Sequence, residues 1–266
     1  MTTARILVAL AAWAAASPVH AQSLLDDAQR FFYNGRYDAA HTLTLQLCSP
    51  DLDGLAGCEL RSSTLLFQIK REVGRQADKQ KAFKACGRCG DWMSEFRSVT
   101  SSAQAVARAR LKAAPEDEAT RFLLGKVDLN YVWLQLGVLG HKTGWGEYWE
   151  ARKSLDAVLE QNPGNVRARV SRAWIDYIVD TQMPRGTRWV LGGGNKKRGL
   201  TTVREAAEAD ADVFIRAEAG FALWDMQVRE GNIAGAVETA RRLARDFPDN
   251  EELRKFLIAH ESCVSD

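Results

Sequence analysis

The chain has 266 residues, and 36 Lys and Arg stand against 34 Asp and Glu, for a formal net charge of +2. This balance argues against nucleic acid as the partner, because proteins that bind it carry a basic excess. The composition favours an all-α protein, because the chain has only 6 Pro, abundant Ala, Leu, Arg and Glu, and few alternating β-branched residues. Its length suits one extended domain or two small ones.

Residues 1–21 are predicted to be a secretory signal peptide. Arg5 precedes an apolar run over residues 6–16, and a small-residue pattern predicts cleavage after Ala21. The apolar run is shorter than the ~20 residues that span a bilayer. No Cys follows the cleavage site to carry a lipid, and no later segment is apolar enough to span a membrane. We therefore expect a periplasmic or secreted protein.

The first half of the expected mature chain contains two helical patterns and a polar stretch. Residues 23–48 predict a helical hairpin whose turn contains Gly35. Residues 58–73 predict a further helix, and residues 75–84 predict a solvated connector because they are polar and basic. The apolar face of the helix over 58–73 is formed by Leu60, Leu65, Leu66 and Ile69.

All five cysteines lie in the exported part, where an oxidising compartment makes them disulfide candidates. Proximity alone favours the pairs Cys48–Cys58 and Cys86–Cys89 and leaves Cys263 free. The Cys86-x-x-Cys89 spacing also fits a thiol–disulfide redox protein, although no strand-helix-strand pattern surrounds it. A zinc site built from the four paired cysteines is a weaker alternative, because only one pair has ligand spacing.

The second half alternates helices with two oversized connections. Residues 137–146 form a glycine-rich insert, and residues 181–194 form a second long turn; loops of this length in a compact domain are usually functional or disordered. Asp91 is the expected N-cap of the first helix, and Trp145 and Trp189 are expected in the loops. The predicted helices are residues 91–112, 116–136, 147–162, 165–180 and 196–208.

Residues 217–250 form the clearest unit of the chain. Two amphipathic patterns meet at Gly231, which can end a helix in the left-handed conformation, and the second stops before Pro248. Ala236, Ala240 and Leu243 share one helix face. A unit of this kind cannot bury its apolar face alone and needs stacked neighbours. Residues 251–260 then predict a capping helix.

These units resemble tetratricopeptide repeats. Gly35, Tyr37 and Ala40 match the turn glycine, the following aromatic and the first small residue of the second helix. The same register recurs at Ala151, Leu155, Val158 and Pro163. The resemblance implies a right-handed α-α superhelix of stacked hairpins, with a concave groove that binds a protein or peptide partner. It divides the mature chain into a Cys-bearing region with one hairpin, residues 22–115, and a repeat region with the capping helix, residues 116–266.

The two long connections hold the candidate ligand-binding residues. A glycine run over 192–194 leads into a helix N-terminus, where backbone N–H groups favour an anion, so a small anionic ligand is one hypothesis. Aromatic rings with a polar tip suit binding surfaces. The candidates are Trp145, Trp149, Arg185, Arg188, Trp189, Lys196 and Lys197. No catalytic motif stands beside them, so we expect no enzyme activity, cofactor or metal.

A weaker resemblance covers about a dozen residues. Gly193, Gly194, Lys197 and Gly199 are similar to a segment of the T-component family of TRAP transporters, which is exported and all-helical. The leading expectation is an exported tetratricopeptide-type binding or scaffold protein. The alternatives are a periplasmic ligand-binding component of a TRAP-type transporter and a redox protein that uses Cys86 and Cys89.

Overall fold

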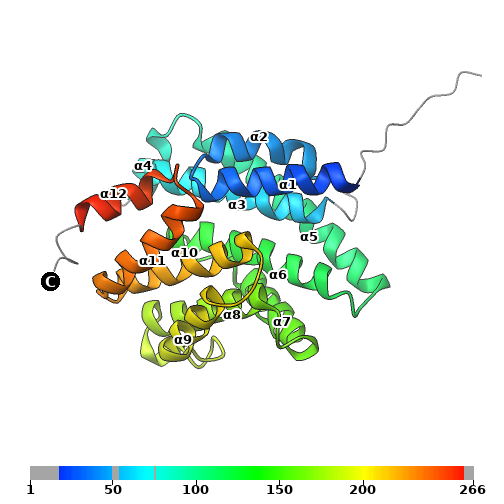
Figure 1. The fold of residues 1–266 in the computed structure, drawn as a ribbon. Coiled ribbons are helices and arrows are strands. Elements are labelled where there is room, and N and C mark those ends of the chain that lie inside the picture. The colour runs from blue at the N-terminus through cyan, green and yellow to red at the C-terminus, as the bar shows by residue number, and fades with distance from the viewer. Residues whose placement is uncertain (1–17, 50–53, 75, 261–266) are drawn as a thin grey trace, which may run out of the picture.

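The computed structural model describes residues 18–49, 54–74 and 76–260, which form an all-α protein (Figure 1). The described residues contain twelve α-helices, a six-residue π-helical segment at Trp133–Val138 and a 3₁₀ turn at Arg185–Thr187. The α-helices are α1 (Pro18–Tyr33), α2 (Tyr37–Leu47), α3 (Leu55–Val73), α4 (Lys79–Ala85), α5 (Cys89–Ala113), α6 (Glu118–Val132), α7 (Trp145–Gln161), α8 (Val166–Gln182), α9 (Lys196–Ala207), α10 (Val213–Arg229), α11 (Ile233–Asp246) and α12 (Glu251–Ala259).

Helices that follow one another in the chain pack against one another, as the hairpin prediction requires. Gly35 between α1 and α2, and Gly231 between α10 and α11, both have a φ of 72°, so both predicted turn glycines are confirmed. A residue with a side chain rarely adopts this left-handed conformation. The predicted apolar faces are also confirmed, since Leu65, Ile69 and Ala240 are all fully buried.

A helical glycine lies at a close contact in each of the hairpins α8–α9 and α10–α11. A methyl group added at Gly199 would lie 2.8 Å from the carbonyl oxygen of Ala173, and one added at Gly220 would lie 2.9 Å from Leu243 Cδ2. Both distances are too short for carbon, so a larger residue at position 199 requires the backbone to move, and one at position 220 requires the Leu243 side chain to move. The two hairpins therefore use the same device for close packing.

The predicted connector over residues 75–84 is wrong, because residues 79–85 form α4. Asp78 caps this helix by accepting a hydrogen bond of 2.9 Å from the backbone N–H of Lys81. Phe83 packs against the core formed by α3 and α5. The local charge hides a short helix in which two adjacent residues, Ala82 and Phe83, pack against the core.

Several predicted helix boundaries need correction. Helix α5 begins at Cys89, so Asp91 lies in its first turn and is not its N-cap. Helix α7 begins at Trp145, which therefore does not lie in the preceding insert. Helix α10 begins four residues before the predicted unit at Ala217, because Asp212 caps it by accepting from the N–H of Phe214 at 2.8 Å. Of these three boundaries, only that of α10 is set by a side-chain cap.

The hairpin formed by α1 and α2 packs against α10 and the residues after α11, and the hydrogen-bonded residues lie more than 200 positions apart in sequence. The Tyr33 ring stacks on the Phe221 ring with centroids 5.6 Å apart. Asn250 Nδ2 donates a hydrogen bond of 2.7 Å to the carbonyl oxygen of Tyr33, and the Asp249 N–H donates one of 3.0 Å to Asn34 Oδ1. Figure 1 shows α1–α3 on one side of the molecule and α7–α9 on the other, with α6 and α10 between them.

A cluster of charged side chains joins helices from both sides. Glu218 on α10 binds Lys126 on α6 at 2.6 Å and Arg167 on α8 at 2.8 Å, and Arg167 reaches Glu59 on α3 at 3.8 Å. All four side chains are mostly buried. Burial alone would raise the pKa of Glu218, but the charges of Lys126 and Arg167 outweigh it and lower that pKa to about 2. The charged form of Glu218 is therefore part of the folded state.

Two disulfides tie the N-terminal helices, and both are the pairs that proximity favoured. The sulfur atoms of Cys48 and Cys58 are 2.19 Å apart, which links the end of α2 to α3, and those of Cys86 and Cys89 are 2.01 Å apart. A sulfur in a disulfide is not a thiolate, so this paired state is not a zinc site. Cys263 lies outside the described residues.

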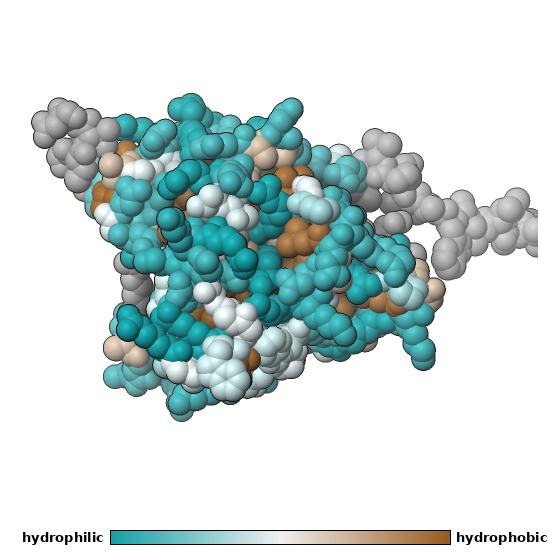
Figure 2. Space-filling view, turned by 90° about the horizontal axis from the view of Figure 1, so that it is seen from below, coloured by the Kyte–Doolittle hydropathy of each residue, from teal (hydrophilic) through white to brown (hydrophobic). Residues whose placement is uncertain are grey.

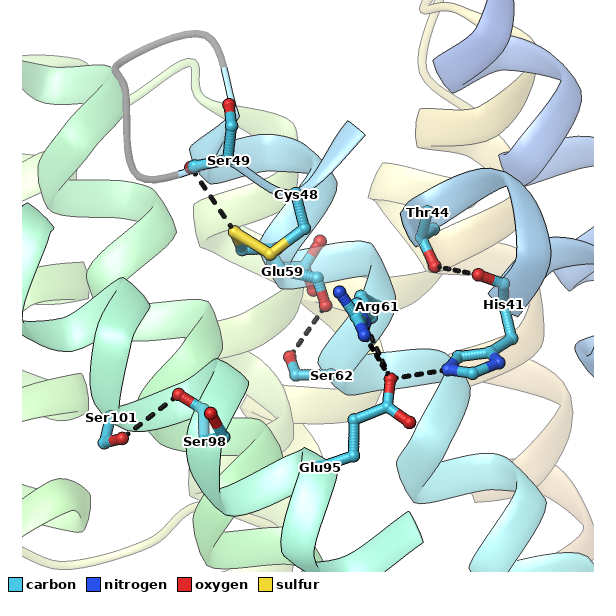
Figure 3. The surroundings of a disulfide bond; sticks show 11 residues. His41, Thr44, Cys48, Ser49, Glu59, Arg61, Ser62, Glu95, Ser98 and Ser101 are labelled. Carbon is cyan, nitrogen blue, oxygen red and sulfur yellow. Dashed lines mark hydrogen bonds and ion pairs between the residues drawn. A yellow bond between two sulfur atoms is a disulfide. The ribbon is translucent and has the colours of Figure 1, made fainter. Parts of the chain in front are cut away.

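Beside the first disulfide, three polar side chains connect α2, α3 and α5 (Figure 3). Glu95 Oε1 lies 2.6 Å from His41 Nε2 and accepts a hydrogen bond of 2.8 Å from Arg61 Nε. Burial would raise the pKa of Glu95, but the hydrogen bonds from His41 and Arg61 outweigh it, so the pKa lies below its ordinary value. The disulfide and this cluster together fix the N-terminal helices.

The disulfides are consistent with an oxidising compartment. Among the described residues, no helix is long and apolar enough to cross a membrane. Residues 1–17 of the predicted signal peptide lie outside the described residues. The predicted cleavage after Ala21 falls within α1 and stays a prediction.

A buried carboxyl on α6 behaves differently from Glu218. Asp128 Oδ1 accepts a hydrogen bond of 2.7 Å from Gln104 Nε2, and the residue is fully buried. Burial, together with the neighbouring charge of Glu150, raises the pKa of Asp128 to about 8. Glu150 itself stays ionised because its hydrogen bond with Arg108 holds its pKa below the ordinary value.

We expect Glu218→Gln to lower the free energy of unfolding by about 3–5 kcal/mol, because it leaves Lys126 buried without its counter-charge and leaves Arg167 with only the more distant Glu59. Urea unfolding followed by circular dichroism at pH 7 measures this loss. Glu238→Gln, at an exposed position on α11, is the matched control and should change the free energy by no more than about 0.5 kcal/mol. Equal stability of the two variants would contradict the assigned role of the cluster.

We expect Asp128→Asn to stabilise the protein increasingly as the pH rises. The folded pKa of about 8 lies above the unfolded value, so the benefit of the protonated carboxyl is present at low pH and is lost as the pH rises toward 8. The neutral amide avoids that loss, with a gain on the order of 1 kcal/mol or more at pH 8 and little gain at pH 4. Thermal unfolding at both pH values measures this gain in stability, with the exposed Asp27→Asn as the control. A gain that is independent of pH would contradict the raised pKa of Asp128.

Candidate functional site

Three tryptophans in the second half of the chain are exposed. Trp145 and Trp149, on the first turns of α7, expose 42% and 43% of their surface, and Trp189 in the second long connection exposes 77%. Val190 beside it is also exposed. We call these four residues the tryptophan surface. Large exposed apolar side chains that gather in this way are typical of interaction sites.

Tyr148 joins the two parts of the tryptophan surface from beneath. Its hydroxyl donates a hydrogen bond of 2.7 Å to the carbonyl oxygen of Leu191, and its ring meets the Trp149 ring edge-on, with centroids 5.3 Å apart. Burial raises the pKa of Tyr148, so the phenol keeps the proton that it donates. Arg152 Nη1 donates to the same carbonyl at 3.1 Å. These hydrogen bonds attach Leu191, which lies two residues after Trp189, to α7.

The second long connection is a folded turn. The N–H of Gly193 donates a hydrogen bond of 2.8 Å to the carbonyl oxygen of Arg188, and Gly192 and Gly193 have φ values of 77° and 73°. Asp180 accepts from the Arg188 guanidinium and, at 2.8 Å, from the backbone N–H of Lys196. One carboxylate from α8 therefore binds both ends of the turn.

This carboxylate occupies the place where the sequence predicts an anionic ligand. Asp180 takes the N–H of Lys196, and Asn195 caps α9 by accepting from the N–H of Arg198 at 2.8 Å. Two N–H groups at the start of α9 thus already have acceptors within the protein. The anion hypothesis stays a prediction, and the structure offers an internal anion at that position.

The four basic candidates divide into two kinds. Arg188 pairs with Asp180, and Lys196 Nζ pairs with Glu230 at 2.7 Å, so both charges are compensated inside the fold. Arg185 and Lys197 are exposed and make no ion pair with the described residues. Only the second pair leaves positive charge available to a partner.

Figure 2 shows one face of the molecule, which is largely hydrophilic with separate hydrophobic patches. Exposed apolar side chains are thus dispersed on this face.

Sequence reasoning named the exposed rings but missed the residues that position them. Nothing in the sequence pairs Tyr148 with Leu191, 43 residues away. The ion cluster was missed for the same reason, since Lys126 and Glu218 are 92 residues apart. Lys126 and Glu218 could be noticed in the sequence only as charged residues that interrupt an apolar helix face.

No protein-family model matches the chain, and searches of curated proteins and of solved structures find no significant match. The functional argument therefore rests on the residues and their geometry.

We expect Tyr148→Phe to loosen the turn at residues 188–193 without unfolding the protein, because it removes one buried hydrogen bond worth about 1 kcal/mol. Amide hydrogen exchange should become several-fold faster in that turn and stay unchanged in α3. Tyr131→Phe is the control, because its hydroxyl makes no hydrogen bond with the described residues. Unchanged exchange in the turn would show that Tyr148 does not hold it.

Proposed function

We propose that this protein is an exported binding protein of the tetratricopeptide type, and that its tryptophan surface holds an acidic segment of a partner protein. The observation that carries the proposal is the exposure of three rings, Trp145, Trp149 and Trp189, together with the hydrogen bond from Tyr148 that ties the turn after Trp189 to α7. The two disulfides support export.

The right-handed superhelix belongs to this proposal. Its support is the sequence of packed hairpins, the left-handed turn glycines at positions 35 and 231, and the close contacts at Gly199 and Gly220. Stacked repeats of this kind bury a continuous core and present extended binding faces. The division at residues 115 and 116 into a Cys-bearing region and a repeat region is part of the same proposal.

The tryptophan surface suits a protein partner better than the charged cluster between the helices does. Tryptophan contributes a large contact area with few rotatable bonds, and it dominates the energetics of many interfaces. By contrast, the inward-facing side chains Arg167 and Glu218 already satisfy each other at 2.8 Å. A partner that displaced them would have to compensate two buried charges. The proposal therefore places binding at the long connections.

Charge favours an acidic partner segment. Arg185 lies four residues before Trp189, and Lys197 lies in the first turn of α9; both are exposed and lack ion pairs with the described residues. Glu147, between the two tryptophans of α7, is partly buried. Uncompensated positive charge beside apolar rings accelerates association with an acidic partner and fixes its orientation.

Two other functions remain predictions. For the redox alternative, the geometry offers one supporting observation: Cys86 is only partly buried, whereas Cys89 is fully buried at the start of α5. The partly accessible sulfur belongs to Cys86, which ends α4 and lies three residues before the start of α5, and accessibility is one requirement for a reactive thiol. For the transporter alternative, Gly199 has a packing role against α8, which accounts for its small size without a ligand.

The proposed partner binding is tested with Trp149→Ala/Trp189→Ala. The variant should keep its helicity and lose binding, because truncation of central aromatic residues reduces affinity at least about tenfold. Immobilised protein is exposed to a periplasmic extract of the source organism, and bound proteins are quantified by mass spectrometry. Ile258→Ala, which removes an exposed apolar side chain on α12, is the control.

The supporting result is an acidic protein that both wild type and the Ile258 variant retain and the double tryptophan variant loses. A purified candidate then gives the affinities directly. Equal retention by all three proteins, or a partner whose binding is unaffected by Arg185→Gln/Lys197→Gln, would overturn the proposal.

A further inference from the structure

A second surface feature is formed by residues other than those of the tryptophan surface. A cleft of about 220 Å³ opens between α4, α5 and the residues that follow the π-helical segment. Phe83 from α4, Met93 from α5 and Leu139 form its apolar floor. The cleft therefore draws on three separate elements, including the first of the two oversized connections.

The rim of this cleft is basic. Lys79, Lys84, Arg97 and His141 line it, and no carboxylate among the described residues does. Lys84 and Arg97 are exposed and make no ion pair with the described residues. Lys79 Nζ donates a hydrogen bond of 2.8 Å to the carbonyl oxygen of Gly74, which holds its charge at the cleft. An apolar floor under a rim of one sign is a complementary site for an amphiphilic anion.

The π-helical segment shapes one wall of the cleft. Residues 133–138 continue α6 with a wider turn, so the N–H of Leu139 bonds the carbonyl oxygen of Leu134, five residues earlier, at 3.0 Å. His141 is fixed next, since its N–H donates to the Gln135 carbonyl oxygen at 2.8 Å and its Nδ1 lies 2.9 Å from Gln135 Oε1. Such turns are rare and occur frequently at functional sites. This observation is independent of the charge of the rim.

We propose that the cleft binds a small organic carboxylate with an aromatic or short aliphatic body. The carboxylate lies between Lys84 and Arg97, and the body rests on Phe83 and Leu139. The arginine offers the planar pair of donors that matches a carboxylate. The volume of about 220 Å³ lies below the roughly 300–1,000 Å³ of pockets for drug-sized ligands. The size of the cleft therefore limits the ligand to a small acid.

The test uses benzoate as the probe, titrated into the full-length mature protein labelled with ¹⁵N. Amide shifts should change at residues 83, 93, 97, 139 and 141 and saturate in the low-millimolar range or below. Benzylamine has the same ring with the opposite charge and should bind at least about tenfold more weakly. Inorganic phosphate has charge without an apolar body and should also bind at least about tenfold more weakly.

Lys84→Gln/Arg97→Gln should weaken benzoate binding at least about tenfold, while Arg241→Gln, an exposed arginine on α11, should leave it unchanged. Phe83→Ser should weaken benzoate without affecting any residual phosphate binding. Both altered cations are exposed, so the fold should persist, as circular dichroism verifies. Absence of saturable shifts at the cleft in the wild-type protein, equal binding of benzylamine, or unchanged affinity in the double variant would each overturn the proposal.

Discussion

The contact between oppositely charged side chains at Lys126, Arg167 and Glu218 is the constraint on which the helical arrangement depends. Three helices, α6, α8 and α10, meet at one carboxylate, and Arg167 extends the cluster to Glu59 on α3. Hydrophobic contacts tolerate sliding, whereas a buried charge is stable only near its partner. The cluster therefore fixes how the helices are placed relative to one another, and apolar packing supplies most of the stability around it.

The sequence predicted those parts of the fold that depend on local signals. Helices end near Gly231 and Pro248, as expected. The apolar face of α3 was predictable because buried apolar residues recur at helical spacing along it. The failures have a common physical origin. Helix α4 has seven residues, too few for a period to emerge, and α10 begins at a cap, Asp212, whose hydrogen bond no hydropathy pattern reveals.

The candidate site was predictable in kind but not in geometry. Trp189 was singled out because a tryptophan in a long loop has no obvious core to enter, and it is indeed exposed. The partner of each basic residue was not predictable, because the contact between Lys196 and Glu230 joins residues 34 positions apart. The basic cleft combines α4 with the insert after α6, so its existence depended on a helix that the sequence concealed.

The hydrogen bonds from Asn250 and Asp249 to Tyr33 and Asn34 bring the two ends of the helical array together. In an open array of repeats, terminal units fray and refold one at a time, so loss of an end unit leaves the remainder nearly as stable. In this protein the first hairpin and the residues after α11 contact each other. The array should therefore melt as a single cooperative unit, and its folding must await the closure of a loop longer than 200 residues, a slow and entropically unfavourable event.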